Sequence, residues 1–276
     1  MQIKYFPVNS KNSYVVFENN DKIEELEPFM KENKLSRVIF SGFLGYSKSV
    51  LPFNEDIDLI EEITIQCSNI TDLTPLYHLS NIKKISIEEN AVLAYPFDIR
   101  KIAKLTDFFT DDTLKIDGFF DHPTLKQLHI EPKKTKKLDI HNKNNILESL
   151  SIANSHILDL SNCKKFTNLK GLYIAYLPKI EDINFILDMP TLTDIEICSC
   201  KKIDNLIATL VQKNNLEKLT LWNQGNLDSI IPLSKLEHLT TLNIWEQTKI
   251  IDGKISFLEE MPNLKKIDIR KYTHYH

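Results

Sequence analysis

The chain has 276 residues, of which 42% are hydrophobic and 26% are charged, as is typical of a globular protein. The net charge is −4, and only 3 of the 34 basic residues are arginines (Arg37, Arg100 and Arg270), which argues against a nucleic-acid-binding protein. Only 6 glycines are present, and no apolar run reaches the roughly 18 residues of a transmembrane helix, so neither a glycine-rich phosphate loop nor a membrane protein is expected.

The first 34 residues have a pattern of their own. Residues 4–20 predict a strand, a turn at residues 9–12 and a second strand. Residues 21–34 predict a helix with Asp21 as its N-cap, because apolar side chains recur on one helical face. We therefore predict that residues 1–34 form an N-terminal cap. The start of the chain lacks the apolar core of a secretory signal, so a cytoplasmic location is expected.

One short pattern recurs through residues 35–270: apolar, two variable, apolar, one variable, apolar. Its first positions lie 20 to 25 residues apart, at Leu35, Ile60, Ile82, Leu105, Leu125, Leu147, Leu169, Leu192, Leu216, Leu239 and Leu264. The alternation predicts a strand that is buried on one face. A single strand of this kind cannot bury its apolar row, whereas parallel stacking of successive strands creates a continuous core.

The clearest copy, residues 60–87, contains the segment ITDLTPLYHL and resembles the leucine-rich-repeat family, in particular the 22-residue repeats of internalins. The resemblance implies an α/β fold class. It predicts a right-handed leucine-rich-repeat solenoid (a horseshoe) with a parallel concave sheet of about 10–11 strands. Residues 35–270 would form the repeats, with short 3₁₀ turns or small helices on the convex side. Residues 271–276 would be a fraying tail. The family's asparagine ladder is degenerate here, and only Asn90 matches it.

No catalytic motif is recognisable in the sequence. Nucleotide-binding loops, nucleophile elbows and HExxH zinc motifs are all missing. The four cysteines (Cys67, Cys163, Cys198 and Cys200) are expected to be reduced thiols. We therefore predict a protein that is not an enzyme and that has neither a cofactor nor a metal site.

The variable positions of the repeats point to a binding surface, because the strands of a curved solenoid line its concave face. From the second to the tenth repeat, ten acidic residues stand at outward positions against two basic ones, Lys84 and Lys218. Large aromatic side chains, including both tryptophans, share this face. The predicted protein-binding residues are Glu88, Glu89, Asp107, Phe109, Asp111, Asp112, His129, Glu131, Tyr173, Tyr176, Asp194, Glu196, Trp222, Trp245 and Glu246.

An acidic face with aromatic anchors favours a basic protein partner and disfavours nucleic acid. The hypothesis that we favour is a non-enzymatic inhibitor or immunity protein that neutralises a basic protein, for example a toxin nuclease. The composition, rich in Lys, Ile and Asn, is typical of a bacterial protein from an AT-rich genome. An intracellular scaffold or regulatory subunit is the alternative, and an internalin-like adhesin is the second alternative. The oligomeric state stays open, a monomer included.

Overall fold

The computed structural model describes residues 1–5, 13–89, 93–111, 113, 115–141 and 143–276. The predicted turn at residues 9–12 and the predicted binding residue Asp112 lie outside this part of the chain. The polypeptide forms two compact units, Met1–Ile130 and Glu131–His276. Each unit is described by itself.

The first unit contains one main sheet. Its strands follow in the order β1 (Gln2–Tyr5), β2 (Ser13–Val16), β3 (Arg37–Ser41), β4 (Glu62–Gln66), β5 (Lys84–Glu88), β7 (Asp107–Thr110) and β9 (Gln127–Ile130). The first two strands pair antiparallel, and each later strand pairs parallel with the one before it. A small parallel ladder joins β6 (Phe97–Asp98) and β8 (Ile116–Asp117). The helices are η2 (Ile23–Glu25), α1 (Leu26–Asn33), η3 (Gly42–Leu44), η4 (Thr74–His78) and η5 (Ile99–Lys101).

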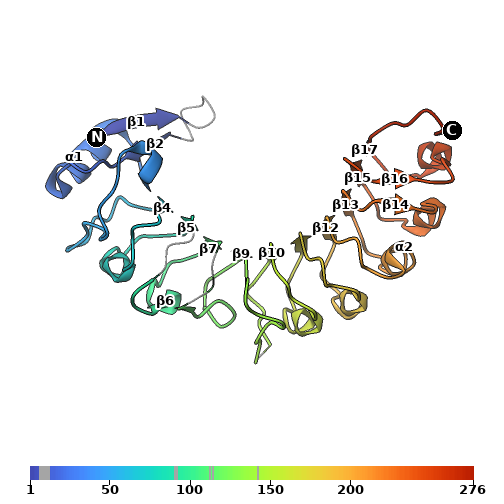
Figure 1. Cartoon of the computed structure of the whole chain (residues 1–276), viewed down its shortest axis with the longest axis horizontal. Coiled ribbons are helices and arrows are strands. Elements are labelled where there is room, and N and C mark those ends of the chain that lie inside the picture. The colour runs from blue at the N-terminus through green and yellow to red at the C-terminus, as the bar shows by residue number, and fades with distance from the viewer. Residues whose placement is uncertain (6–12, 90–92, 112, 114, 142) are drawn as a thin grey trace. The chain divides into compact units, whose positions relative to one another are not determined.

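The second unit repeats the same plan. Its parallel sheet contains β10 (Ser149–Ala153), β11 (Gly171–Ala175), β12 (Asp194–Cys198), β13 (Lys218–Trp222), β15 (Thr241–Trp245) and β17 (Lys266–Ile269). Strands β14 (Asn226–Leu227) and β16 (Lys249–Ile250) form a short ladder. The helices are η6 (Ser161–Lys165), η7 (Asn184–Asp188), α2 (Leu206–Leu210), η8 (Ile231–Lys235) and η9 (Ser256–Glu260). Within this unit the main strands lie on one side and the short helices on the other (Figure 1).

The repeated apolar positions form the core of both units. In β4, Ile63 and Ile65 are almost fully buried, and in β13 so are Leu219 and Leu221. Each such side chain contributes about 1.5–3 kcal/mol when it leaves water. The pattern is weaker in β17, where Ile267 stays 43% exposed because this strand pairs on one side only. Each of the eleven predicted repeat strands is present.

The predicted N-cap role of Asp21 is wrong. Its carboxylate instead accepts the backbone N–H of Glu18 at 2.8 Å and binds the ammonium of Met1 at 2.6 Å. The 3₁₀ turn η2 comes next, and α1 begins only at Leu26. Asp21 therefore closes the turn after β2 and does not start the helix.

The predicted fraying of the C-terminal residues is also wrong. His276 donates its backbone N–H to Gly253 at 2.9 Å and accepts the N–H of Ile255 at 2.9 Å. The Tyr275 hydroxyl accepts the N–H of Ile250 at 2.8 Å. Gly253 has φ +66°, and a Cβ there would lie 2.4 Å from the carbonyl oxygen of His274. The segment therefore packs on the turn before η9, and only glycine leaves room for it.

A second set of side chains links successive repeats just before the strands. An asparagine or threonine stands immediately before the first apolar residue of many repeats and donates to a backbone carbonyl of the preceding repeat. Asn215, for example, donates from Nδ2 to Pro190 at 2.8 Å, and Thr191 donates from Oγ1 to Leu169 at 2.9 Å. The pre-strand donors are Asn81, Thr124, Asn168, Thr191, Asn215 and Asn263. These bonds satisfy carbonyls that the strands leave free.

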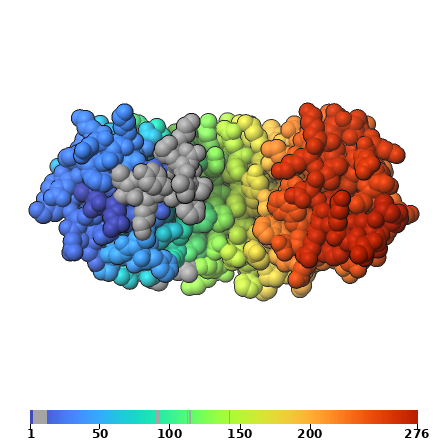
Figure 2. All heavy atoms as spheres, turned by 90° about the horizontal axis from the view of Figure 1, so that it is seen from above, coloured from blue at the N-terminus to red at the C-terminus, as the bar shows by residue number. Residues whose placement is uncertain are grey.

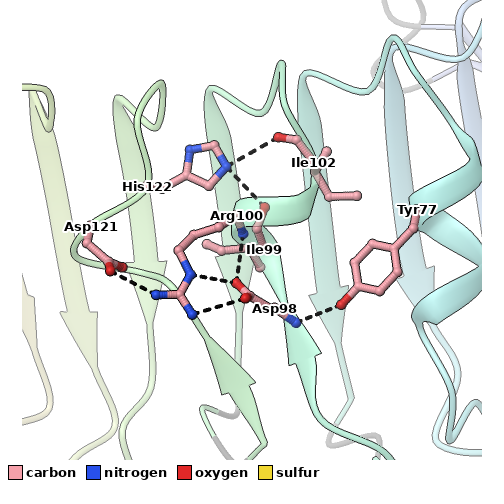
Figure 3. Close-up of polar contacts among 7 residues, drawn as sticks. All are labelled: Tyr77, Asp98, Ile99, Arg100, Ile102, Asp121 and His122. Atoms are coloured by element: carbon pink, nitrogen blue, oxygen red, sulfur yellow. Dashed lines mark hydrogen bonds and ion pairs between the residues drawn. The ribbon is translucent and has the colours of Figure 1, made fainter.

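The return segments of the first unit are joined by a polar cluster around Arg100 (Figure 3). The Arg100 guanidinium binds Asp98 through Nε at 2.8 Å and Asp121 through Nη1 at 2.9 Å. The Tyr77 hydroxyl accepts the N–H of Asp98 at 2.8 Å. His122 is buried, and its Nε2 lies 3.0 Å from the carbonyl oxygen of Ile99. These contacts tie three consecutive returns together on the side away from the main sheet.

Candidate protein-binding surface

The strands sort their solvent-facing side chains into rows. In each repeat the first, third and fifth strand positions face away from the core, and parallel register aligns them with the same positions of the next strand. We call these the first, second and third outward rows. The residue after the fifth position is the rim position. Among the described residues, six non-glycine rim residues have positive φ: Glu89, Asn154, Tyr176, Ser199, Asn223 and Glu246. This left-handed turn ends the strand and directs the chain into the return.

The first outward row is balanced in charge. In the first unit Arg37, Glu62, Lys84 and Asp107 are neighbours in this order across β3, β4, β5 and β7. Arg37 Nη2 lies 2.9 Å from Glu62 Oε1. In the second unit Lys218 Nζ lies 3.4 Å from Asp194 Oδ2. The predicted acids Asp107 and Asp194 therefore lie beside cations, and the acidic bias does not come from this row.

The second outward row brings two predicted residues of the first unit together. The rings of Phe109 and His129 stack with centroids 4.2 Å apart and an interplanar angle of 7°. Both side chains are half-buried. The stacked pair is a flat, rigid, partly exposed surface on the strand side of the unit.

In the second unit the same row holds Tyr173 and Glu196 side by side. The Tyr173 ring lies over Gly171, where a Cβ would be 2.9 Å from the hydroxyl. The hydroxyl donates to Asp194 Oδ2 at 3.3 Å, and burial raises the pKa of Tyr173 to about 12. Burial and the nearby Asp194 carboxylate raise the pKa of Glu196. Because Gly171 has no Cβ, the Tyr173 ring can approach the strand closely.

The acids of the first unit gather where the strands end. Glu88 stands in the third outward row, with Glu89 at the rim after it and Asp111 just after β7. Glu88 is held in place, because Oε2 accepts from Gln66 at 2.7 Å and Oε1 from Ser86 at 2.9 Å. In the second unit the carboxylate of Glu131 accepts from Asn154. Each of these acids is at least partly exposed.

The aromatic residues of the second unit gather at the corresponding strand ends. Trp222 and Trp245 are register neighbours in the third outward row, with ring centroids 5.9 Å apart and an angle of 83°. Tyr176 occupies the rim after β11 and is 51% exposed, while Trp222 is 36% exposed. We call Tyr176, Trp222 and Trp245 the aromatic cluster. The repeats that carry it follow in chain order as successive bands on the strand side of the unit (Figure 2).

Two features near these residues are not apparent in the repeat pattern. Tyr272 follows the last strand and donates from its hydroxyl to the Glu246 carbonyl at 3.3 Å, and the Arg270 guanidinium lies 5.7 Å from the Tyr272 ring centre. In the first unit a cavity of about 560 Å³ opens between Tyr14 of the cap and the outward rows of β3, β4 and β5. Neither Tyr272 nor Tyr14 belongs to a regular repeat position, so the repeat pattern gave no signal for them.

The four cysteines are candidates for a reactive or metal-binding site, but their thiols are buried. All four cysteines are buried free thiols, and burial raises the pKa of Cys200 to about 12, which leaves the thiol protonated. No cluster of three or more metal-binding side chains occurs among the described residues. Within the same part of the chain, no helix has both the length and the apolar character needed to cross a bilayer.

The alignment of the parallel strands, together with the returns between them, identifies the type of repeat. Equivalent apolar positions of successive repeats, such as Leu172, Ile195 and Leu219, lie side by side on parallel strands, and short 3₁₀ or α-helical returns connect them. The chain has the leucine-rich-repeat fold. Leucine-rich-repeat solenoids typically present an extended surface for protein binding.

Solved leucine-rich-repeat proteins have similar folds. An internalin from Listeria monocytogenes aligns with 88% of this chain and 85% of its own, at 14% identity and a TM-score of 0.43. A leucine-rich-repeat protein from Leptospira interrogans aligns with 94% of this chain and 72% of its own, at 12% identity and a TM-score of 0.45. No protein-family model matches the sequence, and no curated protein matches it.

Proposed function

We propose that this leucine-rich-repeat chain is a non-enzymatic protein that binds a basic protein partner through the strand ends of its repeats. The observation that carries the proposal is the partly exposed aromatic cluster with the exposed carboxylate of Glu246 beside it. Exposed Trp and Tyr on a rigid surface are the residues that dominate binding energy at protein interfaces. Carboxylates around them speed the encounter with a basic partner and reject acidic ones.

The role that we favour within this function is inhibition of the partner, as an immunity protein inhibits its toxin. Parallel strands fix the surface before binding, so little ordering entropy is lost on association. A rigid repeat surface of this kind is suited to cover a basic active site. A scaffold that leaves the partner active is the alternative, and a cell-surface adhesin is the second alternative.

The first experiment is affinity capture from cell lysate at low and high salt, with wild type and a Trp222→Ala/Trp245→Ala double variant as baits. We expect one basic protein that binds wild type, binds less at high salt and is lost from the double variant. A Phe43→Ala variant is the control, because Phe43 is 82% exposed and lies outside the proposed surface. An acidic partner, or one that the double variant retains, would show that the surface is wrong.

The captured partner then decides the role. Inhibition predicts that its activity falls in the complex, whereas a scaffold predicts that its activity persists. Fractionation of the source cells tests the cytoplasmic location that inhibition of an intracellular toxin requires. Recovery on the outer surface of the cell would favour the adhesin.

A further inference from the structure

The two tryptophans form an aromatic wall at the strand ends of the second unit. Trp222 and Trp245 meet edge to face, so their rings present two surfaces at nearly a right angle. Register places Trp222 beside Cys198, and Tyr176 follows the strand on the other side of Cys198. The neighbouring Cys198 thiol and, to a smaller extent, the Glu246 carboxylate raise the pKa of Tyr176.

An unsatisfied acceptor stands beside this wall. Asn243 lies in the second outward row, two residues before Trp245, and is 8% exposed. Its Nδ2 donates to Thr220 Oγ1 at 3.0 Å, but its Oδ1 is buried and has no hydrogen-bond partner among the described residues. A buried acceptor without a partner costs about 1–3 kcal/mol. A donor from a ligand would remove that cost.

Two carboxylates stand near the tryptophans. Glu246 follows Trp245 at the rim and is exposed, and Asp268 adjoins Asn243 on β17. Neither carboxylate has an ion pair among the described residues. The chain's own cation here, Arg270, points to the ring of Tyr272 and to the backbone carbonyl of Glu246, at 3.4 Å. It therefore leaves the Glu246 carboxylate free.

A planar cation with several donors would serve these features together. A guanidinium stacks on an indole face, carries five donors and has no acceptor. We propose that the Trp222–Trp245 wall, with Glu246 and Asn243 at its sides, is a subsite for an arginine side chain of the protein partner. The subsite rests on the proposed function and gives the chemistry of the partner's anchor residue.

Tryptophan fluorescence tests the subsite directly, because Trp222 and Trp245 are the only two tryptophans in the chain. The probe is N-acetyl-arginine amide, and the matched neutral probe is N-acetyl-citrulline amide, which has the same length but no charge. We expect a saturable change in emission with the arginine probe and at least a tenfold weaker response to the citrulline probe. N-acetyl-aspartate amide should give no response.

Variants identify the groups that hold the probe. Glu246→Gln keeps both tryptophans and should weaken binding of the arginine probe about tenfold, a loss of about 1.4 kcal/mol. Asn243→Leu removes the unsatisfied acceptor and should also weaken binding of the arginine probe. Glu237→Gln is the control, because Glu237 is an exposed carboxylate on the return before β15, and it should bind like wild type.

The outcomes separate the subsite from the proposed function. Equal responses to the arginine and citrulline probes, or unchanged binding by Glu246→Gln, would overturn the arginine subsite. If partner capture still depends on the tryptophans in that case, the proposed function stands without it. If the arginine probe binds as expected but no protein is captured, the tryptophan wall binds a guanidinium, and the protein-binding function with its partner arginine fails.

Discussion

His122 shows how a single buried side chain can hold two returns together. Its Nδ1 accepts the backbone N–H of Thr124 at 3.2 Å, so in the neutral ring the proton is on Nε2, which faces the carbonyls of Ile99 and Ile102. Burial lowers the pKa of His122, although both carbonyls favour the charged form. The neutral ring therefore suits the folded protein, and protonation opposes folding.

The first prediction concerns how the free energy of unfolding depends on pH. The pKa of His122 is lower in the folded than in the unfolded protein. The neutral ring therefore contributes fully to the free energy of unfolding above about pH 6.5, and this contribution is lost as the pH falls through the folded pKa. In His122→Gln this loss should disappear, since the amide can still donate to a carbonyl but does not titrate. Urea denaturation of both proteins at pH 7 and pH 5 measures the difference. Equal losses would rule out His122 as the cause.

At the scale of the element, the apolar residues alone predicted the strands. Leu216, Leu219 and Leu221 fall at the expected spacing, and their burial follows from the alternation that every strand shares. The pre-strand donors were missed, although an Asn or Thr before the first apolar position is visible in the sequence. The strand pattern does not show which carbonyl such a side chain reaches, because the acceptor lies about 20–25 residues earlier.

The pre-strand donors lead to a second prediction. Asn215→Ala removes the bonds to the carbonyls of Pro190 and Leu192, at 2.8 and 3.2 Å. We expect it to lower the free energy of unfolding by about 0.5–1.5 kcal/mol. The adjacent Asn214→Ala is the matched control, because Asn214 is exposed and should change stability by less than about 0.5 kcal/mol. Chemical denaturation compares the two. Equal effects would mean that the pre-strand bonds add nothing.

The binding surface was predicted less well than the strands. The alternation placed the members within the strands, such as Phe109, Glu196 and Trp245, on the outward side, because the side-chain period of a strand is two. It did not show which charges are paired, because Arg37, which pairs with Glu62, lies in the first repeat, outside the repeats that were counted. The pairing of Lys218 with Asp194 depends on long side chains that can lie in several directions. Whether these residues bind a partner stays a prediction.

At the scale of the whole molecule, we expect the free energy of opening each strand to depend mainly on its immediate neighbours. Within the second unit each strand of the main sheet pairs only with the main-sheet strands before and after it, which is the property of a one-dimensional array. Strand β11 has a neighbour on both sides and buries Leu172 and Ile174, whereas β17 has one neighbour and exposes Ile267. Opening of β17 should therefore cost less than opening of β11.

Hydrogen exchange tests this third prediction. Backbone amides of Lys266–Ile269 should exchange at least tenfold faster than those of Gly171–Ala175, because local opening exposes fewer apolar contacts. Adding the captured partner should slow the exchange of Lys218–Trp222 and Thr241–Trp245. Equal protection of β11 and β17 without a partner would show that the second unit opens only as a whole.

The balanced first outward row also limits how such an array can change its length. Arg37, Glu62, Lys84 and Asp107 alternate in sign on consecutive strands. Deleting the repeat of Glu62 would set Arg37 against Lys84, and deleting the repeat of Lys84 would set Glu62 against Asp107. Like charges on facing positions are destabilising. Removing two adjacent repeats keeps the alternation, so in this stretch gene duplication or loss is tolerated best in pairs of repeats.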